Sequence, residues 1–143
     1  MSSGVSPSPP PGADAVRRVH SGSPFEAPFG YCRGLRLPGG RVLIAGTAPV
    51  LPDGGCDPDV HRQARRCLEI IMNALRELGA EPTDVVRTRM FIVSAADAEA
   101  VGRAHGEVFG AAPPVATMVV VAGLLDPRWK VEIEAEAEVA AGA

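Results

Sequence analysis

A strictly alternating segment near the C-terminus, VEIEAEAE at residues 131–138, constrains the fold more than any other feature of the chain. Successive side chains of a β-strand point to opposite faces of the sheet, so a strand here places its four glutamates on one face and Ile133 with its neighbours on the other. The segment before it, VATMVVV at residues 115–121, is small and aliphatic. We therefore expect two sheet strands, the second of which presents a row of carboxylates.

The row of carboxylates has two interpretations. A charged, solvent-exposed edge strand resists aggregation, and this interpretation suits Glu136 and Glu138. It suits Glu132 less well, because Glu132 follows a very apolar strand and is expected to lie well inside the sheet. Burial disfavours the charged form of a carboxyl group and raises its pKa, which would make Glu132 a general acid or base near neutral pH.

The rest of the chain predicts an alternation of strands and helices. From residue 60 to 78 apolar positions recur every three or four residues, as in an amphipathic helix, and Gly79 follows where a left-handed residue often ends a helix. The other expected elements are strands at 31–37, 41–50, 84–93, 115–121 and 130–139, and a helix at 97–110. The order β-β-α-β-α-β-β predicts an α+β fold with a single sheet and both helices on one face.

The domain organisation follows from length and composition. A chain of 143 residues favours one domain. Residues 1–14 are rich in Ser, Pro and Gly, so we expect a disordered tail followed by a single domain at 15–143. The sheet face away from the helices would be bare, and its strands are too apolar to face water. Burial against other copies of the chain is the expected remedy, which predicts a homo-oligomer.

Composition and charge disfavour several classes of partner. The net charge of -3 and the scattered arginines give no electrostatic reason to expect nucleic acid or an anionic membrane. No signal peptide and no run of apolar residues long enough to span a membrane is present, which favours a cytoplasmic protein with reduced thiols. The three cysteines and three histidines form no metal-binding pattern, and no nucleotide-binding glycine motif occurs, so neither a metal nor another cofactor is predicted.

Two arginines lie on a predicted strand. Arg87 and Arg89 share one face of the 84–93 strand with Phe91. They are either surface residues or guanidinium groups that bind a substrate carboxylate in a bidentate pair. His105 stands alone on the second helix and is expected to be structural rather than catalytic.

Seven segments, in this order, resemble those of one protein family. They are FGYCRGLRL, LIAGTAPV, QARRCLEIIMNALRELGA, DVVRTRMFIV, VGRAHGEVFG, PPVATMVVVA and VEIEAEA, and they extend from about Phe29 to Val139. The chain resembles the RidA/YjgF family of reactive imine and enamine deaminases, once labelled L-PSP endoribonucleases. The resemblance implies a fold like that of the trimeric chorismate mutases, and a homotrimer in which the open sheet faces pack together and three sites lie in clefts between subunits.

The resemblance also implies a chemistry, the hydrolysis of an imine or enamine to a ketone and ammonia. A glutamate of the last strand, which corresponds to Glu132, would position or activate the attacking water. The family's early tyrosine corresponds to Tyr31, and a backbone N–H that helps to polarise the substrate would lie near Gly46.

Two positions depart from the family pattern. Ala116 stands where the family has a carboxylate-binding arginine, and Gly102 stands where an asparagine is often found. Ala116 and Met118 share one face of their strand, so with Ala116 in the cleft we expect a roomier and more apolar pocket. Arg89 is a candidate replacement cation, with Phe91 beside it.

The predicted function is therefore hydrolysis, or related acid–base chemistry, on a small and rather apolar imine, enamine or carbonyl compound, as in specialised metabolism. The absent arginine leaves open a second hypothesis, a non-catalytic trimer that binds a small molecule or a partner protein in the same clefts. RNA cleavage, which the older family name suggests, is disfavoured by the acidic charge and the lack of a basic groove.

Overall fold

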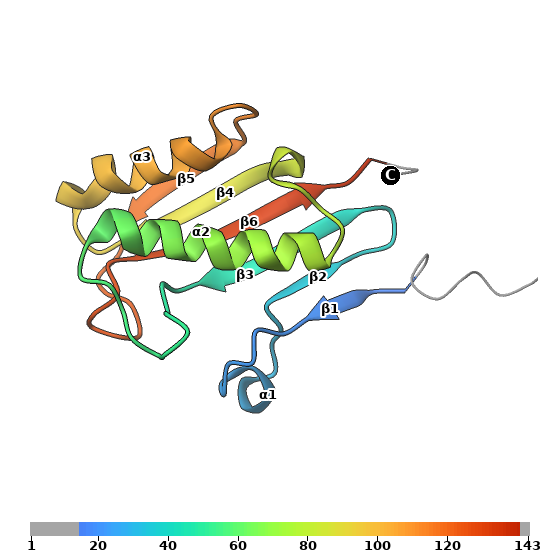
Figure 1. Ribbon diagram of the computed structural model, residues 1–143, viewed down its shortest axis with the longest axis horizontal. Helices are drawn as coiled ribbons and strands as arrows, with labels where there is room; N and C mark the ends of the chain where they lie inside the picture. Colours follow the sequence, from blue (N-terminus) through green and yellow to red (C-terminus); the bar gives the residue numbers. More distant parts are fainter. Residues whose placement is uncertain (1–14, 141–143) are drawn as a thin grey trace, which may run out of the picture.

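The computed structural model describes residues 15–140. The predicted disordered tail, residues 1–14, and the end of the predicted domain, residues 141–143, lie outside that range, so the domain boundaries stay a prediction. Within the described range the predicted order of strands and helices is present, and the fold is α+β as expected (Figure 1).

One six-stranded sheet forms the body of the molecule, in the order β1-β2-β3-β6-β4-β5 (Figure 1). The strands are β1 (Arg17–Val19), β2 (Gly34–Arg36), β3 (Arg41–Thr47), β4 (Val85–Ile92), β5 (Val115–Val120) and β6 (Val131–Glu138). Neighbouring strands run antiparallel, except that β4 and β5 are parallel. The alternating segment forms β6, which lies between β3 and β4 and so inside the sheet, as expected for Glu132. The interpretation of Glu136 and Glu138 as part of an edge strand is wrong, because β6 has a neighbouring strand on each side.

Two long helices, α2 (Val60–Glu77) and α3 (Ala98–Phe109), cover one face of the sheet (Figure 1). α2 begins after Asp59, whose side chain accepts a hydrogen bond from the backbone N–H of Arg62. It is followed by Gly79, whose φ of 79° is the left-handed conformation that the sequence predicts. Within the described range no helix combines the length and the apolar character that crossing a membrane requires.

The hydrophobic core lies between these helices and the sheet. From α2 it takes the buried residues Ala64, Cys67, Leu68, Ile71 and Leu75, and from β6 it takes Val131, Ile133, Ala135 and Ala137. The helical repeat of about 3.6 residues and the strand repeat of two thus present their apolar positions to the same layer. The glutamates of β6 consequently point to the opposite face of the sheet, away from the helices.

Several short elements were not predicted. They are β1, the single-turn helix α1 (Glu26–Phe29), and two 3-10 turns, η1 (Pro82–Asp84) and η2 (Ala95–Asp97). Each is only three or four residues long, too short to show a periodicity in the sequence. β1 pairs with β2 and extends the sheet at one edge.

The sheet face away from the helices is uncovered in the single chain. On β4 and β6 it carries residues that lie opposite one another, namely Arg87 and Glu136, Arg89 and Glu134, and Phe91 and Glu132. On β5 it ends in Val115 and Val119, which are 59% and 43% exposed. The bare face is present as predicted, in strands that were expected to be too apolar to face water. Its centre is charged, and exposed apolar side chains gather at the β5 edge.

Candidate active site

A β-bulge in β3 forms one wall of the candidate site. The pairing of β3 with β6 is regular up to Ile44 and is shifted before Thr47, so β3 has one residue more than β6 at this point. Gly46 lies in the bulge, and a Cβ atom at this position would be 3.0 Å from Oε2 of Glu132. The absence of a side chain at Gly46 therefore lets the Glu132 carboxylate lie against the backbone of β3.

The environment of Glu132 changes its acidity. Glu132 is half-buried on the open face of the sheet. Burial raises its pKa, the nearby charge of Glu134 adds to the rise, and the positive charge of Arg33 opposes it. The carboxyl group therefore stays protonated to a higher pH than an ordinary glutamate, and its pKa moves toward the range in which one group can both accept and donate a proton.

Arg33 belongs to this site, although the sequence did not single it out. It is only 9% exposed, and its Nη1 atom donates to the carbonyl oxygen of Gly46 at 2.7 Å and to Oγ1 of Thr47 at 2.9 Å. The Thr47 hydroxyl in turn donates to the carbonyl oxygen of Ala45 at 2.8 Å. These three hydrogen bonds hold the bulged backbone against which Glu132 lies.

Tyr31 contacts Arg33 and so lies next to the same site. The Arg33 Cζ atom lies 5.9 Å from the centroid of the Tyr31 ring, within the range of a cation–π contact. Tyr31 is 38% exposed, so one side of its ring remains accessible. We call Tyr31, Arg33, Gly46 and Glu132 the Glu132 cluster. Tyr31, Gly46 and Glu132 were candidate site residues in the sequence, and Arg33 was not. The sequence pattern that could have pointed to Arg33 is its position as a charged residue between Cys32 and Gly34, in the first of the family-like segments.

Arg89 and Phe91 lie on the same open face as the cluster. The Arg89 guanidinium pairs with Glu134 at 3.0 Å and with Glu136 at 3.4 Å. Arg89 is therefore held by two carboxylates of its own chain, which argues against its expected role as a free cation for a substrate. Phe91 lies directly opposite Glu132 and offers an apolar neighbour to it.

Ala116 and Met118 lie on the other face of the sheet. Along the parallel pair β4–β5, Ala116 lies beside Thr88 and Met118 beside Met90, whose side chains are buried beneath the helices. Within one chain, then, Ala116 and Glu132 lie on opposite faces of the sheet. A site that contains both residues requires two chains.

A histidine, His105, contacts Thr88 on this helix-covered face. Nε2 of His105 is 2.7 Å from Oγ1 of the fully buried Thr88, and the His105 ring packs on Phe109 with centroids 4.7 Å apart. Burial lowers the pKa of His105, so the ring is neutral at physiological pH. These contacts fit the structural role predicted for His105.

Comparison with known proteins places this geometry in a family. The family model for endoribonuclease L-PSP matches residues 23–139, which is most of the chain. The chain belongs to the YjgF/RidA family. The α+β fold with a six-stranded sheet is the fold of its structural neighbours, and homotrimers are the norm in the family.

Individual relatives of the YjgF/RidA family cover nearly the whole chain. The protein SCO2049 of Streptomyces coelicolor is 41% identical over 87% of this chain and 93% of its own length. The crystal structure of Rv2704 from Mycobacterium tuberculosis is 40% identical, with a TM-score of 0.80 over 87% of this chain and 100% of that one. The structure of E. coli TdcF with bound serine is 28% identical, with a TM-score of 0.73 over 87% and 94% of the two chains.

The start of β6 is fixed by the buried side chain of Gln63. Its Nε2 atom donates to the carbonyl oxygens of Asp57 at 2.7 Å and Arg128 at 3.0 Å, and its Oε1 atom accepts from the N–H of Lys130 at 2.8 Å. One amide therefore joins α2, the loop before it and the connection from β5 to β6. This anchor lies two residues before Glu132 and restricts the strand that carries it.

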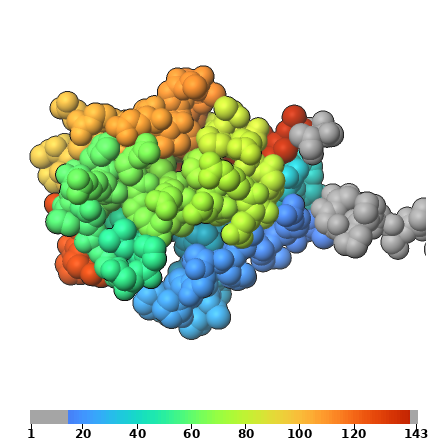
Figure 2. Space-filling view, in the orientation of Figure 1, coloured from blue at the N-terminus to red at the C-terminus, as the bar shows by residue number. Residues whose placement is uncertain are grey.

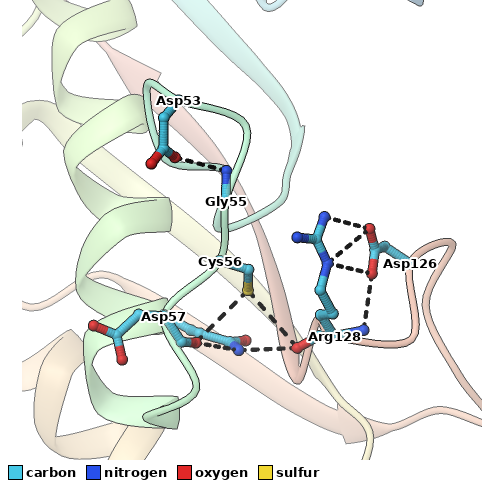
Figure 3. Close-up of polar contacts among 7 residues, drawn as sticks. Asp53, Gly55, Cys56, Asp57, Asp126 and Arg128 are labelled. Carbon is cyan, nitrogen blue, oxygen red and sulfur yellow. Dashed lines mark hydrogen bonds and ion pairs between the residues drawn. The ribbon is translucent and has the colours of Figure 1, made fainter.

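The two loops meet beside Cys56 (Figure 3). Its Sγ atom lies 3.6 Å from the carbonyl oxygen of Asp57 and 3.8 Å from that of Arg128. The Arg128 guanidinium is paired with the Asp126 carboxylate at 2.8 Å, as Figure 3 shows. Burial raises the pKa of the Cys56 thiol, which keeps it protonated, so this region supports the site rather than supplying a nucleophile.

A metal centre has no obvious ligand set here. Within residues 15–140, no three His, Cys, Asp or Glu side chains lie close enough together to hold a metal ion.

Proposed function

We propose that this protein is an acid–base enzyme that hydrolyses a small, rather apolar imine or enamine to a ketone and ammonia, in clefts between the subunits of a homotrimer. The observation that carries the proposal is the Glu132 carboxyl group, which lies half-buried against Gly46 with its pKa raised by burial. Membership of the YjgF/RidA family supports a small-molecule reaction of this kind. The serine bound to the relative TdcF supports a small ligand rather than a macromolecular one.

The reaction needs a group that first accepts a proton from water and later donates a proton to the leaving nitrogen. The imine reacts in its N-protonated form. The Glu132 carboxylate takes a proton from water as the water oxygen bonds to the carbon of this protonated imine, which gives a neutral carbinolamine and protonated Glu132. The Glu132 carboxyl then gives its proton to the amino nitrogen, and as the carbon–nitrogen bond breaks the hydroxyl proton of the intermediate passes to the Glu132 carboxylate, so that ammonia and the carbonyl compound are released. An enamine enters the same path after the protonated form of Glu132 has delivered a proton to its carbon.

The substrate class follows from what surrounds the cluster. Ala116 offers no cation, and Arg89 is already paired with Glu134 and Glu136, so a free carboxylate on the substrate finds no dedicated anchor. Phe91 opposite Glu132 favours an apolar substituent near the reacting carbon. We therefore expect 2-iminoacids such as 2-aminoacrylate to be poorer substrates than uncharged imines of similar size, because a lost charge pair costs about 2–5 kcal/mol.

The Glu132→Gln variant tests the proposal, with Glu138→Gln as a matched control on the same strand face but exposed. Ammonia release from uncharged imines should fall by about 100-fold or more in Glu132→Gln, the range typical of a lost general base, and stay near wild type in Glu138→Gln. Turnover by Glu132→Gln at the wild-type rate would remove Glu132 from the mechanism.

The alternative is a non-catalytic trimer that binds a small molecule or a partner protein in the same clefts. The alanine at position 116 favours it, since the position matches the family's substrate-binding arginine. In that case a compound from the same panel would raise the melting temperature of the protein while no product forms.

A further inference from the structure

A second hollow lies apart from the open sheet face, between α2 and the chain that follows β1. The cavity has a volume of about 240 Å³, and its lining includes Ser21, Arg33, Arg66, Ile70, Asn73 and Glu77. In Figure 2 the blue atoms of the N-terminal segment and the green atoms of α2 lie on its two sides. This size suits a metabolite smaller than a drug-like molecule, whose pockets are roughly 300–1,000 Å³.

Arg33 brings a buried and incompletely paired cation to this cavity. Among residues 15–140 it has no carboxylate partner, and only its Nη1 atom is bonded, to two uncharged oxygens. The nearby buried carboxylate of Glu26 accepts hydrogen bonds from Ser21 and His20 instead. A guanidinium has five N–H donors, so most of those of Arg33 are not used by the described protein.

The unused donors of Arg33 are not sealed inside the protein. In the described part of the chain, the only enclosed side-chain nitrogen or oxygen without a partner is Nε1 of Trp129. The remaining Arg33 donors therefore border accessible space, and Arg33 is one of the residues that line the cavity. The charge of Arg33 interacts with the carboxylates of Glu26 and Glu132, but among the described residues neither forms an ion pair with it within 4 Å, so its unused donors are open to direct hydrogen bonds to an anion.

The rest of the lining defines the shape and charge of the occupant. Arg66 is bonded through Nε to the carbonyl oxygen of Val50 at 2.7 Å and through Nη1 to Glu69 at 2.9 Å, so its second terminal nitrogen is left over. Ile70 adds an apolar wall, while Glu77 on the same helix face adds a negative charge. One acidic group with an apolar body matches this set, whereas a second negative charge on the ligand would be repelled by Glu77.

We propose that this cavity binds a small monocarboxylate with an apolar body. Its carboxylate pairs with the free edge of the Arg33 guanidinium, in the bidentate geometry that arginine forms with carboxylates, and its body contacts Ile70. The same guanidinium holds the carbonyl oxygen of Gly46, so the ligand binds to the residue that supports the Glu132 cluster from behind. The site does not depend on the proposed hydrolysis.

Binding is tested on the full-length protein by calorimetry and by amide chemical shifts, with benzoate as probe and with benzamide and inorganic phosphate as comparisons. Benzoate should bind saturably and shift the amide signals of Ser21 and Asn73, while benzamide and phosphate bind at least tenfold more weakly. Arg33→Lys should weaken benzoate binding about tenfold or more, because it removes the fork of donors. Arg103→Lys, on the exposed side of α3, should bind benzoate as the wild type does.

Ile70→Trp provides an independent variant that fills the cavity and leaves the buried cation in place. It should weaken benzoate binding by a similar factor. If Arg33→Lys does not fold, the affinity of Ile70→Trp for benzoate is enough to test whether benzoate binds in the cavity. The proposal is overturned if phosphate binds as tightly as benzoate, if benzoate does not bind, or if Ile70→Trp binds it with wild-type affinity. None of these measurements requires turnover, so a failure here is separate from a failure of the proposed hydrolysis.

Discussion

Glu132 and Glu136 occupy the same face of the same strand, yet the fold gives them opposite acid–base character. Glu132 lies against Gly46, and burial raises its pKa. Glu136 lies 3.0 Å from Arg41 and 3.4 Å from Arg89, and the hydrogen bond from Arg41 is the main reason that its pKa is lowered. The period of the strand decides where a glutamate points, and its neighbours decide whether it holds a proton.

The largest effect on this contrast is expected from Gly46→Ala, which removes the space that Glu132 occupies. A Cβ atom 3.0 Å from Oε2 must displace the carboxylate, and displacement of a catalytic group by about 1 Å can cost about 100-fold in rate. We expect kcat/KM for imine hydrolysis to fall by about that factor. Gly106→Ala on α3 is the control, since a Cβ there meets nothing within 4 Å. Equal activity of the two variants would contradict the arrangement.

Arg33→Met should lower stability and sharpen the acid–base contrast. It removes the hydrogen bonds from a charged donor to Gly46 and Thr47, and bonds of that kind contribute about 1.5–3 kcal/mol each. It also removes the cation that holds the pKa of Glu132 down, so that pKa should rise further. Urea unfolding and carboxyl NMR titration measure the two effects. An Arg103→Met variant serves as the exposed reference, and a loss of stability no larger than in that variant would refute this role of Arg33.

The two glutamates should also differ in how they affect the melting temperature at pH 7. The pKa of Glu132 is raised by folding, so its stabilising effect is present at low pH and is lost as the pH rises through the folded pKa. At pH 7 the buried charge of Glu132 is unfavourable, and Glu132→Gln, which removes that charge, should therefore raise the melting temperature. The pKa of Glu136 is lowered, so its contribution is present above the unfolded value and is lost as the pH falls through the folded pKa.

Glu136→Gln should accordingly lower stability at pH 7, by less than about 1 kcal/mol because its ion pairs are partly exposed. Its difference from the wild type should shrink in acid, where the native Glu136 is itself protonated. Thermal scans of both variants at several pH values, at one protein concentration, make the comparison. Shifts of the same sign at pH 7 would mean that the two environments do not differ as described.

The smallest effect is expected from Glu134→Gln. The charge of Glu134 contributes to the raised pKa of Glu132, so its removal should move the acidic limb of the pH–activity profile to slightly lower pH. Glu138→Gln, on the same face but at the exposed end of the strand, should leave the profile where it is. A shift toward higher pH would show that Glu134 acts through its pairing with Arg89 and not through its charge.

Much of the fold could be predicted because its long elements are periodic. Apolar positions recur over several helical turns in α2 and at every second residue in β6, and Gly79 marks the end of α2. β1 and α1 are too short to produce such a signal. The interior position of Glu132 was predicted from the apolar strand before it, whereas the bulge at Gly46 depends on register between distant strands, which no local pattern carries.

The face of β5 that carries Ala116 could not be predicted from the sequence, for a specific physical reason. Alternation shows that Ala116 and Met118 share a face of β5, but it does not show which face. In β6 the glutamates show which face is the open one. In β5 the open face carries Val119 and the face toward the core carries Met118, so the two faces have similar polarity and alternation cannot tell them apart. The sequence therefore gave no means to tell that Ala116 lies on the opposite side from Glu132.

The charged centre of the open face has a consequence for self-recognition. Any copy of the chain that covers this face takes Arg89, Glu134 and Glu136 away from water together. A surface that leaves these three groups satisfied is accepted, and one that breaks a pair strands a charge in a poorly solvated contact. Complementarity to this charged centre, and not apolar area alone, is therefore what a covering surface must supply.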